Sequence, residues 1–144
     1  MLIARRKIAT LIPHEGAMCL LDGVLEWDES SIRCLSRSHR DEDNPLRRLG
    51  WLHAVCGVEY VSQSMALHGA LSNPGGRRAG KGYLASVRRL VLAVARLDTI
   101  RDDLIIEARQ AMRMDQRTLY DFAMTAGGQT LISGRAAVVL EVAP

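Results

Sequence analysis

Two patterns of apolar and polar positions divide the chain. Residues 51–69 are apolar on nearly every side of a helical projection, although Glu59, Gln63 and two serines interrupt them. Gly69 follows the last apolar position, where helices commonly end. A stretch that is apolar all round is typical of a buried helix. We therefore predict one central helix over residues 51–69.

The other apolar positions alternate with polar ones, as they do in half-buried strands. Residues 104–114 show this well, because Leu104 and Ile106 fall on one face and Glu107 on the other. The glycine pair that follows residue 126 suits a two-residue hairpin turn. Similar stretches predict further strands at residues 19–27, 32–38, 83–95, 118–126 and 129–142, with residues 39–50 as a loop.

These elements predict an α+β fold class and a single domain over residues 1–144. Their order is a short lead-in, two strands, the helix, and then four strands in an antiparallel meander. One helix cannot bury itself, so a sheet of about six strands is expected to curl around it. One face or edge of that sheet remains available to another subunit.

Composition narrows the class of protein. With 144 residues, 48% hydrophobic and 24% charged, the chain resembles an ordinary globular domain. Neither an apolar run of the ~20 residues that a membrane span needs nor a signal peptide is predicted, so we expect a cytoplasmic protein. The three cysteines lack CxxC spacing and are interpreted as reduced thiols.

The charge is weakly basic, at +3 with a pI near 9.0. No basic patch with interleaved aromatic residues accompanies it, so nucleic-acid binding is not expected. An acidic protein partner fits this excess equally well. The arginines that could meet it are Arg47 with Arg48, Arg88 with Arg89, and the basic residues of 77–81.

Few residues offer catalytic chemistry. The four histidines are not at a recognised metal spacing, and neither a GxSxG motif nor a phosphate-binding glycine loop occurs, so no metal and no cofactor are expected. Glu59 remains, because a carboxylate on an apolar helix requires either a partner or a function. It is interpreted as half of an acid/base pair with a histidine. The alternative is a structural ion pair with Arg135.

Several short motifs resemble one enzyme family. The segment from Leu11 through Pro13 and His14 to Val24 looks like the opening of the hotdog-fold 3-hydroxyacyl-(acyl carrier protein) dehydratases. Residues 59–63 resemble the Glu-x-x-x-Gln of their central helix. Closer still is a subgroup of predicted dehydratases associated with aryl-polyene-type lipid clusters. Its features appear here at residues 44–47, 65–69 and 82–88.

The resemblance implies a hotdog fold, in which the sheet wraps the helix, and a homodimer or larger hotdog oligomer. It also implies removal of water from a 3-hydroxyacyl thioester on acyl carrier protein. Glu59 matches the family carboxylate and Gln63 the glutamine that orients it. Backbone N–H groups of Ala54 and Val55 at the helix start would bind the developing enolate oxygen. Tyr83, in the matching third strand, is a further substrate-binding candidate.

The family histidine does not map onto a single residue. His39 lies before the predicted helix and His53 at its start, and both stay open as catalytic candidates, as does the absence of either. His14 and His68 are expected to be structural. Two other functions remain as alternatives to the dehydratase: a hotdog acyl-CoA thioesterase, and a non-catalytic partner that binds acyl groups or carrier protein.

Overall fold

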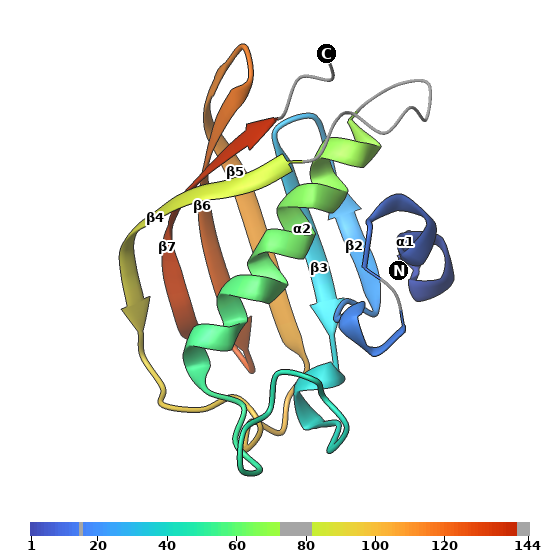
Figure 1. Cartoon of the computed structure of the whole chain (residues 1–144), viewed down its shortest axis with the longest axis vertical. Helices are drawn as coiled ribbons and strands as arrows, with labels where there is room; N and C mark the ends of the chain where they lie inside the picture. Colours follow the sequence, from blue (N-terminus) through green and yellow to red (C-terminus); the bar gives the residue numbers. More distant parts are fainter. Residues whose placement is uncertain (15, 73–81, 141–144) are drawn as a thin grey trace.

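The computed structural model describes residues 1–14, 16–72 and 82–140. Figure 1 shows a twisted sheet wrapped around one long helix, α2, with a short helix, α1, beside the first strands. The helices are α1 (Arg5–Leu11) and α2 (Gly57–Leu71), with 3-10 turns at Gly16–Met18, Ser38–Arg40 and Ala54–Cys56. The strands are β1 (Ile3–Ala4), β2 (Gly23–Trp27), β3 (Ser31–Ser36), β4 (Gly82–Leu92), β5 (Leu104–Met114), β6 (Arg117–Ala126) and β7 (Gln129–Leu140).

The sheet is antiparallel, with the strand order β1-β2-β3-β5-β6-β7-β4. Each predicted strand is present in the structure. The predicted antiparallel meander is confirmed for β5, β6 and β7. It is wrong for β4, which pairs with β7 at the far edge instead of with β5. Residues 93–103 carry the chain from that edge across to β5, which pairs with β3. The predicted short lead-in contains the strand β1 and the helix α1.

The central helix begins at Gly57, later than predicted, because the residues before it pair with another segment. His53 and Arg96 form an antiparallel bridge, Leu97 N–H donates to Leu52 O (2.8 Å), and Ala54 N–H donates to Ala95 O (3.0 Å). These bonds hold the backbone before Ala54 in an extended conformation, as at His53. A single 3-10 turn then leads into the helix.

Most of α2 is buried, as its apolar pattern predicts. Tyr60, Val61 and Leu67 belong to the core that the helix shares with the sheet. At the first turn the helix lies so close to the sheet that a Cβ on Gly57 would meet Ile132 Cδ1 at 2.2 Å. Glycine therefore favours close packing between the helix and the sheet at this position.

Two sequence predictions can be placed beside this architecture. The cysteines are free thiols, two of them buried and Cys56 half-buried. No helix in the described part of the chain is long and apolar enough to cross a membrane. Residues 141–142, the predicted end of the last strand, lie outside the described residues.

Candidate active site at the start of the central helix

Glu59 and Gln63 lie one turn apart on α2, as their spacing predicts. Glu59 is in the first turn, where the helix dipole favours a carboxylate. Its side chain is 36% exposed, whereas Gln63 is completely buried. A solvent-facing carboxylate therefore stands next to a buried amide on the same face of the helix.

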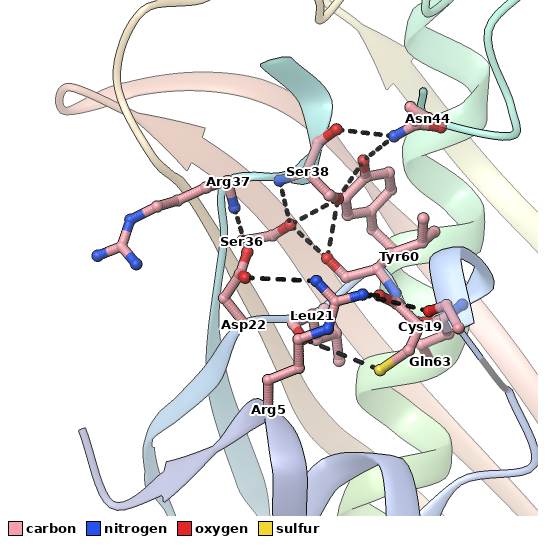
Figure 2. Close-up of polar contacts among 12 residues, drawn as sticks. Arg5, Cys19, Leu21, Asp22, Ser36, Arg37, Ser38, Asn44, Tyr60 and Gln63 are labelled. Atoms are coloured by element: carbon pink, nitrogen blue, oxygen red, sulfur yellow. Dashed lines mark hydrogen bonds and ion pairs between the residues drawn. The ribbon is translucent and has the colours of Figure 1, made fainter. Parts of the chain in front are cut away.

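The amide of Gln63 holds the segment that precedes β2. Its Oε1 accepts a hydrogen bond from Leu20 N–H (2.9 Å), and its Nε2 donates to Met18 O (2.7 Å). The same Nε2 lies 3.4 Å from Glu59 Oε1. Figure 2 shows Gln63 beside Cys19 of this segment. The glutamine thus fixes the carboxylate and the preceding segment relative to each other.

His14, which was expected to be structural, is the histidine that meets Glu59. Its Nε2 lies 3.2 Å from Glu59 Oε1, and its side chain is 27% exposed. The other ring nitrogen, Nδ1, is buried and has no hydrogen-bond partner among the described residues. The Leu11–His14 motif was the available sequence signal for this residue.

The two donors meet on one oxygen of the carboxylate. His14 Nε2 and Gln63 Nε2 both approach Oε1 of Glu59. Within the part of the chain that the structure describes, Oε2 has no hydrogen-bond partner. One oxygen is therefore held in place while the other is available to a substrate.

The 3-10 turn that precedes α2 offers one of the two predicted backbone donors. Ala54 is buried and its N–H is already bonded to Ala95 O. Val55 is exposed, and its N–H has no partner among the described residues. Val55 lies four residues before Glu59 in the sequence, in the 3-10 turn that leads into the helix.

His39 has other partners. It is fully buried, and its Nε2 is 3.0 Å from Ile100 O, so this nitrogen carries the proton and donates to the carbonyl. Burial lowers the pKa of His39, which disfavours the charged form. The observed contacts therefore tie the 3-10 turn Ser38–Arg40 to the β4–β5 connection and do not bring His39 to Glu59.

His53 lies at the helix start with its side chain in solvent. Its ring is 5.6 Å from the ring of Trp51, and the Arg96 guanidinium lies 3.8 Å over that indole. Arg96 is in turn paired with Asp98, whose pKa the arginine lowers to about 2. His53 thus belongs to a surface cluster, and no polar contact in the described residues joins it to Glu59.

A buried hydrogen-bond network supports the same end of the helix. Tyr60 Oη lies 2.8 Å from Ser38 Oγ and accepts a bond from Asn44 Nδ2 (2.9 Å). Ser38 and Ser36 hydroxyls both donate to Leu20 O. Figure 2 shows these groups between α2, the end of β3 and the segment that Gln63 also holds. The N–H of Leu20 is therefore bonded to Gln63, and its carbonyl is linked to Tyr60 through Ser38, so both backbone groups are connected to the helix.

Three further residues clarify the site. Arg135 pairs with Asp121 on the sheet (2.9 Å), so the alternative ion pair with Glu59 is wrong. His68 is structural, as predicted: its Nε2 is 2.9 Å from Asp28 O and its Nδ1 is 2.8 Å from Tyr120 Oη. Tyr83 lies half-exposed on β4, and its role in substrate binding stays a prediction.

Comparison with solved structures supports the fold. The dehydratase heterocomplex ApeI:P from Xenorhabdus doucetiae contains a chain that is 18% identical, with a TM-score of 0.82, over 94% of this chain and 91% of that one. Zebra fish thioesterase superfamily member 2 is 18% identical, with a TM-score of 0.64, over 95% and 93%. A hypothetical thioesterase from Streptococcus pneumoniae TIGR4, solved with coenzyme A, is 12% identical, with a TM-score of 0.58, over 82% and 84%. At these identities the similarity establishes the hotdog fold alone.

Sequence comparison gives the family. No curated protein matches the chain. The ApeP-like family, described as ApeP dehydratase, matches residues 6–142 and so covers nearly the whole chain. This favours dehydration over the thioesterase alternative, whose support is the shared fold. The chain therefore belongs to the ApeP-like family and is a hotdog-fold dehydratase.

Proposed function

We propose that the protein removes water from 3-hydroxyacyl thioesters carried on acyl carrier protein, in the cytoplasm, during synthesis of a polyene-type lipid. The observation that carries this proposal is the arrangement of Glu59. Oε1 is held by His14 and Gln63, and Oε2, on a side chain that is 36% exposed, has no hydrogen-bond partner among the described residues. An oriented carboxylate with one open oxygen suits transfer of a proton to or from a bound substrate.

The reaction needs two proton transfers. A base removes a proton from C2 of the thioester, and the electron pair forms an enolate. The C3–O bond then breaks, the hydroxyl takes a proton from an acid and leaves as water, and the C2=C3 double bond forms. Oε2 of Glu59 is the group we assign to one of these transfers. The N–H of Val55 and the positive end of the helix dipole stabilise the negative charge on the enolate oxygen.

We assign His14 a positioning role. Its Nε2 is engaged with Glu59 and its Nδ1 is buried, so neither nitrogen is open to a substrate in this arrangement. The second proton-transfer group must then come from elsewhere. His39 and His53 would have to leave their present contacts to supply it.

A second hotdog subunit is the proposed source of the missing group. The strand β4 forms one edge of the sheet, and an edge strand presents unpaired backbone groups to another chain. Exposed apolar side chains accompany this edge, as at protein interfaces. They are Tyr83, Leu84, Leu90, Val91 and Leu92. The occupant is a second copy of this chain or a different hotdog chain; the ApeI:P heterocomplex is an assembly with another chain.

The test is turnover of a 3-hydroxyacyl thioester. Mass spectrometry measures its conversion to the enoyl thioester, which is lighter by one water. Glu59→Gln keeps the size of the side chain and a hydrogen-bonding oxygen but cannot exchange a proton. We expect a loss of about 10²-fold or more in kcat. The assay compares the chain alone with the chain mixed with an ApeI-type hotdog partner. Turnover by Glu59→Gln at the wild-type rate in both settings would reject the assignment.

A thiol-release assay on acyl-coenzyme A separates the thioesterase alternative, because a thioesterase frees the thiol whereas a dehydratase leaves the thioester intact. Binding of acyl-loaded carrier protein without turnover, alone and with the hotdog partner, would instead support a non-catalytic subunit. The oligomer is measured by light scattering. A mass near the 15.9 kDa of one chain, at micromolar concentration and with the partner present, would contradict the proposed subunit contact.

A further inference from the structure

A tight hairpin projects from the loop that precedes the central helix. Arg48 and Trp51 exchange two backbone hydrogen bonds (2.8 and 2.9 Å), so Leu49 and Gly50 form a two-residue turn. Both turn residues have positive φ, 51° at Leu49 and 81° at Gly50. Figure 1 shows the segment that contains this hairpin beyond the first turn of α2, at the lower end of the molecule.

Leu49 is an unusual choice for this position. The left-handed conformation favours glycine, asparagine and aspartate, and a leucine there is strained. Its side chain is also 102% exposed, so it gains nothing from burial within this chain. Trp51 and Val55, both exposed, lie beside the hairpin and at the start of the helix. An apolar tip held in a strained turn, next to two more exposed apolar side chains, is suited to contact with another protein.

The hairpin is also positively charged. Arg47 donates to Gly50 O (3.3 Å) and to His39 O (3.2 Å), and so braces the turn from its base. Arg48 is exposed. Burial raises the pKa of the Cys56 thiol, and the nearby positive charge of Arg48 opposes this rise. Neither arginine has a carboxylate within 4.0 Å among the described residues. The charge of the exposed Arg48 is therefore open to an acidic partner, whereas the Arg47 guanidinium is engaged with two backbone carbonyls and adds positive charge behind the turn.

The other arginine groups fit an acidic partner less well. Arg89 lies on β4 and lowers the pKa of Asp121 together with Arg135, so a carboxylate already compensates part of that charge. Residues 77–81 lie outside the described residues. The acidic side chains that precede the hairpin, at 41–43, line a different pocket with Arg5 and Arg40. Arg47 and Arg48 are thus the basic pair beside the site.

We propose that residues 47–51 and Val55 form the docking site for the acidic face of the acyl carrier protein. Arg48 contacts its carboxylates, Arg47 adds positive charge from behind the turn, and Leu49 with Trp51 inserts between its apolar side chains. This inference rests on the proposed function, because it names where the carrier of that substrate binds. It places the carrier at the start of α2, on the side of Val55, so that the attached thioester approaches Glu59 from the open end of the site.

Two variants test the proposed surface, one by its charge and one by its apolar side chain. Arg48→Glu reverses one charge at an exposed position. Leu49→Gly removes the apolar tip, and glycine suits the positive φ, so the turn should be at least as stable as in the wild type. Arg6→Glu, on α1, makes the same charge change elsewhere on the surface and serves as the control. All variants are full-length chains, assayed with the hotdog partner where activity requires it.

Each variant is assayed with the 3-hydroxyacyl group on carrier protein and with the same group on free pantetheine. We expect Arg48→Glu and Leu49→Gly to raise KM for the carrier-bound substrate about tenfold and to weaken calorimetric binding of acyl carrier protein equally, with the pantetheine substrate unchanged. Arg6→Glu should resemble the wild type. Equal effects on both substrates, no effect on either, or a change in oligomer mass that follows the hairpin variants would overturn the docking site.

The proposed function fails separately from the docking site. If the wild type turns over neither substrate, dehydration of these thioesters is rejected, and the calorimetric binding of carrier protein alone decides on the hairpin. Undiminished binding by both hairpin variants then rejects the docking site, whereas a loss confined to them supports it.

Discussion

Gln63 Nε2 lies 3.4 Å from Glu59 Oε1 while it donates to Met18 O at 2.7 Å. One buried amide therefore links the catalytic candidate on the helix to the backbone of the preceding segment. Because the amide oxygen also accepts from Leu20 N–H, every direction of the Gln63 side chain is fixed. The position of the carboxylate thus depends on a segment distant from it in sequence.

Replacement of Gln63 by methionine should damage both stability and activity. The apolar side chain has a similar size but leaves Leu20 N–H and Met18 O without partners. An unsatisfied buried group costs about 1–3 kcal/mol, so a loss of a few kcal/mol in the free energy of unfolding is expected. Urea denaturation measures it. Gln63→Glu keeps an acceptor for Leu20 N–H but puts a buried carboxyl oxygen against Met18 O and Glu59, so it should also be destabilised, and wild-type stability in both variants would contradict this account.

His14 should influence turnover more than substrate binding. His14→Ala removes the donor to Glu59 Oε1, and we expect kcat to fall by about 10-fold to 100-fold with KM within about twofold. His14→Gln, which retains an N–H donor, should recover part of kcat. Steady-state kinetics on both variants measures this. If KM rises while kcat is unchanged, His14 contacts the substrate directly and the positioning role is wrong.

Two buried histidines should make stability depend on pH. Burial lowers the pKa of His39 and of His68 below the 6.5 of an ordinary histidine. The unfolded chain therefore binds more protons than the folded one as pH falls through 6.5, and stability decreases there. Above pH 6.5 both states are neutral at these residues and the contribution is complete. The slope is at most about 1.4 kcal/mol per pH unit for each histidine.

Urea midpoints between pH 7.5 and about 5 measure this slope, because the carboxylates with lowered pKa, such as Asp98, titrate only in more acidic solution. His68→Gln can still donate to Asp28 O and accept from Tyr120, so it should fold and flatten the slope. His39→Gln should flatten it independently. A double variant that keeps the full wild-type slope would show that other groups cause it.

Gly57→Ala should destabilise the protein through crowding between the helix and the sheet. The new methyl group would lie 2.2 Å from Ile132 Cδ1 and 3.3 Å from Met124 Cε. These are ends of flexible side chains, so we expect repacking at a cost of about 1–3 kcal/mol, more than alanine gains in helix propensity. Thermal unfolding measures the change. Gly69→Ala, near the other end of the helix, meets nothing within 4 Å and is the matched control.

Sequence alone determined the central helix, the six longer strands and one half of the site. The alternation along 104–114 and the all-round apolar helix are local patterns, because burial of each face follows from the residues of that element. The spacing of Glu59 and Gln63 placed both on one helical face for the same reason. The family motifs then indicated the hotdog fold and dehydration.

Only the tertiary structure decided three other features, because each depends on residues far apart in the chain. Backbone hydrogen bonds join residues 52–54 to Ala95–Leu97. Because of them α2 begins later in the sequence than its apolar pattern predicts. The same connection takes β4 to the edge beside β7. The partner of Glu59 is His14, because Gln63 binds the backbone of Met18 and Leu20, and backbone groups leave no signature in the sequence.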